Sequence, residues 1–277
     1  MELCIENPSI KSWLRKAIIS HHKKKPSQNV FGVTLLQSLQ IANTPIAYEN
    51  KETVIGIIPI IVAKCGSYLK DQGLYIEGIF RKSGSAKRVG ELQRIFNSSS
   101  DYGIGLNWIG FNVHDAANCL RRFLNYLPEP VIPFGLYQSF RDVATGETEL
   151  YVMIDAYQQL IDQLPHVNQY LLFYLLDLLS LFSRYDQYTK MDSSSLASVF
   201  TPGILLNPED AMNPEHYKLS QRVVQFLIDH QDKFHLPCYP SCYPLYSPLH
   251  KNKLLRANTA PVQKPHFAHY EPLKVKP

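Results

Sequence analysis

The stretch YLLFYLLDLLSLF, residues 170–182, is the longest apolar run in this chain of 277 residues. It is too short to cross a lipid bilayer as a helix, and it contains a charged residue, Asp177. Apolar residues occupy nearly every position, so a helix over residues 166–183 would have no polar side to face water. We therefore predict that this segment is the central helix of a folded core.

Helical periodicity continues on both sides of this segment. Ser85 is a typical N-cap, Pro59 suits a first helical turn, and Pro202 is expected to end the helix before it. Sustained period-two alternation with hairpin turns is not evident in the sequence, so we predict an all-α fold. The other helices are predicted at about residues 59–70, 85–96, 113–127, 147–163, 192–200 and 213–234.

The chain divides into a central domain and two basic ends. Residues 31–236 are predicted to form a single helical domain. Residues 1–30 are predicted to be a basic, amphipathic extension, in which residues 10–19 pack on the domain or bind a membrane surface. Residues 237–277 hold eight of the 19 prolines and six of the 28 Lys and Arg residues, against one acidic residue. We predict that this Pro-rich basic tail is disordered.

Composition and motifs argue against several classes of function. The residues before the tail carry 22 basic and 23 acidic side chains, so they lack the basic field typical of nucleic-acid binding. The five scattered cysteines and the opening MELCIEN, which lacks the order of a secretory signal, predict reduced thiols in the cytoplasm. The sequence has no HExxH, GxSxG or paired metal-ligand motif. We therefore expect neither a self-contained active site nor a metal ion.

The octapeptide GIFRKSGS, residues 78–85, is the candidate functional stretch. It lacks the Gly-Lys-Ser/Thr ending of a phosphate-binding P-loop. Its glycines allow tight bends, and Ile79 and Phe80 are expected to anchor the loop in the core, which would leave Arg81 exposed. An arginine on a stiff loop can stabilise the charge that develops when another protein hydrolyses GTP. The alternative is an ordinary solvated turn arginine.

Blocks on both sides of the octapeptide carry a family resemblance. The segments are FGVTLLQSL (31–39), EGIFRKSGS (77–85), LRRFLNYLPEPVIP (120–133), LPHVNQYLLFYLLDLL (164–179) and SSLASVFTPGILL (194–206). In this order and spacing the chain resembles the Rho GTPase-activating protein (RhoGAP) domain family over roughly residues 31–236. AKCGSYLK, SGSAKR and VHDAANCLRR resemble a fungal subgroup of that family.

The resemblance implies an all-helical domain that binds the GTP form of a Rho-family small GTPase and stimulates GTP hydrolysis. Arg81 would be the arginine finger supplied to the partner, and GTP and magnesium would belong to the partner, so the chain needs no cofactor. The residues assigned to the GTPase interface are Lys82, Ser83, Arg121, Asn125 and Gly203.

Three of these interface positions depart from the family pattern. Arg121 stands where many members have a lysine, Asn125 where they have an arginine, and Gly203 where they have an asparagine. A RhoGAP-like binding or scaffold module without activating ability is therefore the alternative function, although Arg81 argues against it. Asn168 is expected to bridge core backbone. Weak binding of the basic ends to a membrane, and recruitment to sites of polarised growth, are further expectations.

Overall fold

The computed structural model describes residues 29–235, except 51, 99 and 147–148. The amphipathic stretch at 10–19 and the tail at 237–277 lie outside the described residues. Within the described ranges, every helix is too short or too polar to span a lipid bilayer.

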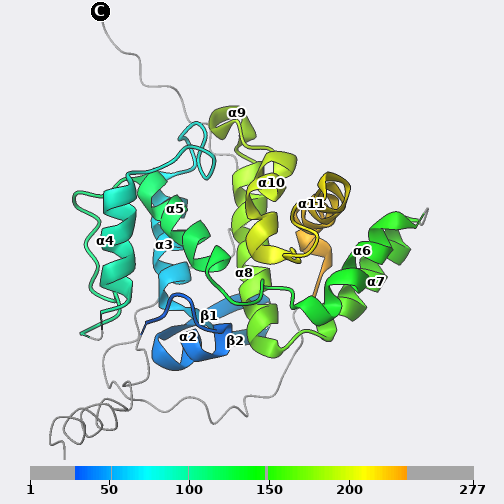
Figure 1. Cartoon of the computed structure of the whole chain (residues 1–277), viewed down its shortest axis with the longest axis horizontal. Helices are drawn as coiled ribbons and strands as arrows, with labels where there is room; N and C mark the ends of the chain where they lie inside the picture. The colour runs from blue at the N-terminus through cyan, green and yellow to red at the C-terminus, as the bar shows by residue number, and fades with distance from the viewer. Residues whose placement is uncertain (1–28, 51, 99, 147–148, 236–277) are drawn as a thin grey trace, which may run out of the picture.

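The helices confirm the predicted helical class (Figure 1). Ser85 and Asn213 cap α4 and α11 through their side chains, as such residues do at helix starts. The described helices are α2 (Leu35–Ile41), α3 (Ile60–Gln72), α4 (Ala86–Phe96), α5 (Val113–Asn125), α6 (Phe134–Thr145), α7 (Leu150–Asp162), α8 (His166–Ser183), α9 (Asp186–Thr189), α10 (Ser193–Ile204), α11 (Pro214–Asp229) and the 3₁₀ turn η1 (Gln231–Lys233).

Helix α8 is the centre of the core, as predicted. It begins and ends at the predicted residues, runs through the middle of the molecule in Figure 1, and is buried along most of its length. The Tyr174 hydroxyl lies directly under Gly66 of α3, where no larger residue would fit. Asn168 donates to the backbone oxygen of Val131 at 2.9 Å, so the expected bridge to core backbone is confirmed.

A β-hairpin is the main difference from the predicted secondary structure. Strands β1 (Asn43–Asn50) and β2 (Glu52–Pro59) pair antiparallel, with Asn43 opposite Pro59. Strand β2 packs against α8, and Gly56 lies so close to the Tyr170 ring that a Cβ atom would be 2.5 Å from Cδ1. The sequence of β2 contains the continuous apolar run VIGII rather than an alternating pattern, and such a run does not distinguish a strand from a buried helix. The prediction missed it for that reason.

Helix α6 was also missed. Pro128, Pro130 and Pro133 precede it, and these prolines indicated an extended segment. Its buried residues, Tyr137, Phe140 and Arg141, nevertheless follow helical spacing. The helical spacing of these residues was the feature of the sequence from which α6 could have been predicted.

Helix α10 continues through Pro202, which corrects the end predicted for it. Proline has no N–H to donate to the carbonyl four residues earlier, which here belongs to Ser198. The hydroxyl of Tyr217 on α11 donates to that oxygen at 2.8 Å instead. A neighbouring helix thus satisfies the group that the proline leaves free. Helix α11 itself ends at Asp229, earlier than the predicted end near Phe234, and η1 follows it.

Candidate functional site

Residues 73–85, here called the finger loop, connect α3 to α4 and run beside α9 (Figure 1). Phe80 has a φ of +66°, in the left-handed region that bulky side chains rarely adopt. Its buried ring packs edge-to-face on Phe182 of α8 and Phe200 of α10, with centroid distances of 4.9 and 5.1 Å. Ile79 is also fully buried. The core therefore fixes the backbone immediately before Arg81.

Hydrogen bonds shape the turn that carries Arg81. Gly78, with a φ of +72°, accepts from the backbone N–H groups of Arg81 at 3.0 Å and Lys82 at 2.7 Å. The N–H of Gly78 donates to the Thr189 carbonyl at the end of α9, at 2.6 Å. A glycine favours this conformation because it has no Cβ.

Arg81 and Lys82 are both exposed at the tip of the loop. The ammonium of Lys82 lies 3.1 Å from a carboxylate oxygen of Glu77, and this hydrogen bond is the main cause that lowers the pKa of Glu77. The charges of Arg81 and Lys190 add to the effect. Among the described residues, the Arg81 guanidinium has no hydrogen bond or ion pair. It is therefore available to a partner.

Helix α5 holds the second half of the loop through Asp115, a residue that the sequence analysis did not select. This fully buried carboxylate accepts from the Ser85 N–H at 2.8 Å and from Arg88 Nε at 2.6 Å. It also accepts from the Asn112 N–H at 2.9 Å. Burial opposes the charged form, but these donors together hold the pKa of Asp115 below its ordinary value. The capping box Asn112-x-x-Asp115 was the sequence signal for this residue.

Asn118 and Arg121, one and two turns further along α5, contact the loop backbone. Asn118 Nδ2 donates to the Lys82 carbonyl at 3.1 Å, and Arg121 Nη1 donates to the Phe80 carbonyl at 2.9 Å. Burial lowers the pKa of the half-buried Arg121 guanidinium. Arg121 thus holds the carbonyl of the residue that precedes Arg81, and its predicted role as a contact for the GTPase stays a prediction.

Gly203 and Asn125 lie together where α10 crosses α5. Gly203 is buried, and a Cβ atom there would lie 2.7 Å from Leu124 Cβ and 3.2 Å from Asn125 Oδ1. The close helix approach therefore requires glycine. Asn125 is exposed above it. The interface assignment stays a prediction for both residues, and the structure shows Gly203 buried against Leu124 and Asn125.

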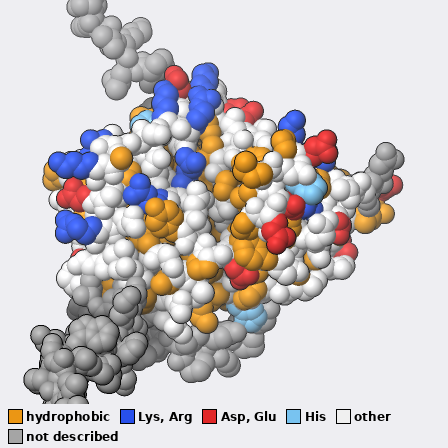
Figure 2. All heavy atoms as spheres, viewed as in Figure 1, with side chains coloured by type: hydrophobic (Ala, Val, Ile, Leu, Met, Phe, Trp, Pro, Cys, Tyr) orange, Lys and Arg blue, Asp and Glu red, His pale blue; other side chains and the backbone are white. Residues whose placement is uncertain are grey.

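A hollow of about 350 Å³ lies beside the finger loop, between the loop and α5. It brings together three of the predicted interface residues, Ser83, Arg121 and Asn125. Its remaining lining residues are Gly84, Ala86, Val89, Asn118, Arg122 and Tyr126. Lys and Arg side chains gather on this side of the molecule, whereas acidic side chains are more frequent over α6, α7 and α11 (Figure 2).

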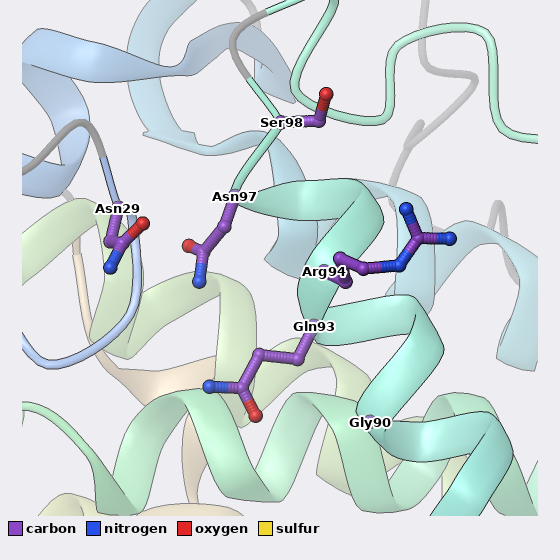
Figure 3. Close-up of a pocket in the computed structure, with 6 residues that line it drawn as sticks. All are labelled: Asn29, Gly90, Gln93, Arg94, Asn97 and Ser98. Atoms are coloured by element: carbon purple, nitrogen blue, oxygen red, sulfur yellow. The ribbon is translucent and has the colours of Figure 1, made fainter.

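A second hollow, of about 500 Å³, lies along the far part of α4 (Figure 3). Asn29 faces Asn97 across it, and Arg94 points away from both. Its polar groups serve the fold: Asn97 Oδ1 accepts from the Val30 N–H at 2.8 Å, and Gln93 Oε1 accepts from Arg122 at 3.2 Å. None of the predicted site residues lines it. In the part of the chain that is described, no group of three or more His, Cys, Asp and Glu side chains could hold a metal ion.

Comparison with known proteins identifies the class to which this fold and loop belong. The RhoGAP domain profile matches residues 59–209, more than half of the chain. The chain belongs to the RhoGAP family. It is similar to Rho-GTPase-activating protein 5 of Schizosaccharomyces pombe, with 39% identity over 82% of this chain and 63% of that protein. It is also similar to Rho-GTPase-activating protein BAG7 of Saccharomyces cerevisiae, with 41% identity over 73% of this chain and 50% of that protein.

These two relatives are fungal, which agrees with the predicted subgroup. The chain spans between half and two thirds of their lengths. The fold is similar to human Rho GTPase activating protein 15, with a TM-score of 0.63 and 21% identity over 82% of this chain and 99% of that chain. It is also similar to the BH domain from GRAF, with a TM-score of 0.56 and 22% identity over 62% of this chain and 91% of that one. At such identity these structures establish the fold alone, and they confirm the predicted helical architecture.

Proposed function

We propose that this protein is a GTPase-activating protein that binds a Rho-family small GTPase in its GTP form and accelerates GTP hydrolysis through Arg81. One observation carries the proposal: an exposed arginine stands on a loop whose backbone is fixed from the core and from α5. Phe80 is locked between α8 and α10, and Arg121 holds its carbonyl. Family membership and the names of the two fungal relatives support the same function.

The proposed chemistry divides the work between two proteins. The GTPase would hold GTP and magnesium and position the attacking water, so this chain would need no nucleotide site, metal or cofactor. When water attacks the γ-phosphorus, negative charge builds on the transferred group and on the leaving oxygen. The planar guanidinium of Arg81 would donate hydrogen bonds to these oxygens. Because the finger loop is already rigid, little reorganisation is needed during the reaction.

The test is single-turnover GTP hydrolysis by Rho-, Rac- and Cdc42-type GTPases, measured with and without this protein. Arg81→Ala should reduce the stimulated rate roughly 10³-fold or more while binding to the GTPase with a non-hydrolysable GTP analogue changes little. Arg81→Lys should restore little of the rate, since an ammonium cannot contact two oxygens in one plane. Arg94→Ala is the matched control, because Arg94 is an exposed arginine on the far part of α4, with 77% of its side chain accessible.

Full stimulation by the Arg81→Ala protein would refute the finger assignment. A second measurement should agree with the first: the variant should lose affinity for a GDP–fluoride transition-state mimic more than for the GTP analogue.

A binding module without activating ability is the second candidate, and the surface around Asn125 favours it. Gly203 offers no side chain there, and Asn125 replaces a cation, so the docking surface differs from the family pattern. Wild-type protein that binds a GTP-loaded GTPase tightly but never accelerates hydrolysis would establish this candidate.

A further inference from the structure

Three tyrosines form a compact cluster on the α9 side of the finger loop. Tyr75 belongs to the loop, Tyr185 precedes α9 and Tyr188 lies within it. Each ring contacts the other two: the centroids of Tyr75 and Tyr188 are 5.0 Å apart, those of Tyr75 and Tyr185 are 5.6 Å apart, and those of Tyr185 and Tyr188 are 6.5 Å apart. We call this cluster the tyrosine face. Tyr75 is 66% exposed and Tyr188 is 47% exposed.

The tyrosine face is joined to the finger loop by backbone contacts. The Thr189 carbonyl accepts the N–H of Gly78, the glycine that starts the turn carrying Arg81. Thr189 is fully buried, and its hydroxyl donates to the Tyr185 carbonyl at 3.2 Å and accepts from the Met191 N–H at 3.2 Å. The backbone that carries the tyrosine face is therefore joined directly to the turn that carries Arg81.

The distance from Arg81 to the tyrosine face is comparable with the radius of the area that a docked GTPase would cover. A protein–protein interface of standard size buries about 800 Å² on each partner, which corresponds to a disc with a radius of about 16 Å. Because residues 78–81 form a hydrogen-bonded turn, the Cα atoms of Tyr75 and Arg81 are at most about 18 Å apart. Tyr75 therefore lies inside the area that a GTPase centred on Arg81 would cover, or close to the edge of that area.

The chemistry of the face also suits docking. Tyrosine is enriched among the residues that dominate binding energy, because its rigid ring offers a large contact area with little loss of conformational entropy. Edge-to-face packing of Tyr75 on Tyr185 and on Tyr188 holds these rings in place before a partner arrives, which lowers the entropic cost of binding further.

We propose that the tyrosine face is a second docking surface for the same GTPase, and that it contacts an apolar patch adjoining the GTPase's nucleotide pocket. This inference rests on the proposed function. In this proposal Arg81 acts in the hydrolysis of GTP, and the tyrosine face contributes to the affinity for the GTPase. It also extends the interface beyond the α5 side, where the predicted contacts Ser83 and Asn125 lie.

The test compares the double variant Tyr75→Ala/Tyr188→Ala with the wild type in GTP hydrolysis at increasing GTPase concentration. The double variant should raise the half-saturating GTPase concentration roughly tenfold or more, as truncation of interface tyrosines does, and leave the maximal stimulated rate unchanged. Tyr75→Phe/Tyr188→Phe keeps the rings and should behave like wild type. Tyr151→Ala is the matched control, because Tyr151 is 68% exposed and belongs to α7, a helix that lies apart from α9 in Figure 1.

The possible results separate this inference from the function on which it rests. An unchanged half-saturating concentration in a double variant that still activates would overturn the tyrosine face and leave the finger intact. A lower maximal rate at unchanged half-saturation would also overturn it as a docking surface. So would concentration-dependent dimerisation that the double variant abolishes without altering the GTPase response, since a second copy would then occupy the face. A wild-type protein that neither binds nor activates a GTPase would overturn both proposals. Circular dichroism checks folding, and the single variants remain if the double variant does not fold.

Discussion

At the scale of single residues, Phe80 adopts the conformation that gives the finger loop its shape. A φ of +66° is unfavourable for a phenylalanine and persists only where the surroundings impose it. Here two buried aromatic rings hold the side chain, and the Arg121 guanidinium holds the carbonyl. The orientation of Arg81 therefore depends on contacts made by the residue before it.

Arg121→Ala should consequently lower the maximal stimulated rate, by roughly tenfold, because the loss of one charge-assisted hydrogen bond loosens the Phe80 carbonyl. Arg121→Lys should recover part of the rate, since an ammonium can also donate to that oxygen. Stopped-flow hydrolysis at saturating GTPase measures this effect. If Arg121 serves only docking, as its family position suggests, the maximal rate will stay constant and only the half-saturating concentration will rise.

At the scale of elements, α5 serves as the support of the finger loop. Its buried Asp115 joins the start of α4 to the start of α5, through Ser85 and Arg88 on one side and Asn112 on the other. Gly84 permits this contact, because a Cβ atom there would lie 2.6 Å from Asp115 Oδ1. The stability of this junction should therefore depend on the charge of one carboxylate.

Asp115→Asn should reduce the free energy of unfolding at pH 7 by about 2 kcal/mol, since it weakens hydrogen bonds to a buried charged group. The folded-state pKa of Asp115 lies below the unfolded value of about 3.9. Its contribution is thus fully present above pH 4 and is lost as pH falls through the folded-state pKa. Urea unfolding of both proteins from pH 7 to pH 3 should show the difference shrinking with acidity. A constant difference would contradict the assignment.

The sequence was sufficient for elements and site residues that depend on local signals. The apolar run of α8, the caps Ser85 and Asn213, and the loop carrying Arg81 were all recognisable there. The hairpin and the extension of α10 past Pro202 were not, because a covering helix and a distant hydroxyl stabilise them. The contacts between Arg121 and Phe80 and between Asn118 and Lys82 join residues 41 and 36 positions apart, so no local pattern reveals them.

At the scale of the whole molecule, the core continues beyond the region that the family profile matches. Helix α11 packs on α6, α8 and α10, and Phe234 after it is buried. Buried Arg141 of α6 bonds to Asp210 at 3.0 Å, which ties the segment before α11 to the domain. The folding unit therefore includes residues on the C-terminal side of 209.

A chain ending at residue 235 should keep the helicity and GTPase activation of the full chain, because the residues removed are Leu236 and those predicted to form the disordered tail. A chain ending at residue 209 should fail to fold cooperatively, since it loses α11 and with it the buried side chains of Val223, Val224 and Leu227, which leaves the core they cover open to water. Circular dichroism melting and hydrolysis assays of the two truncations measure this contrast. Loss of activity in the longer truncation would show that the tail packs on the domain.

The packing of Phe80 between α8 and α10 has a consequence for folding during protein synthesis. The rings that receive it, Phe182 and Phe200, leave the ribosome more than 100 residues after it. A nascent chain cannot fix the conformation of the loop that carries Arg81 until those helices have emerged and packed, since domains fold as units during translation. Incomplete chains would therefore carry Arg81 without the means to present it, and a GTPase would meet a working finger only on a finished domain.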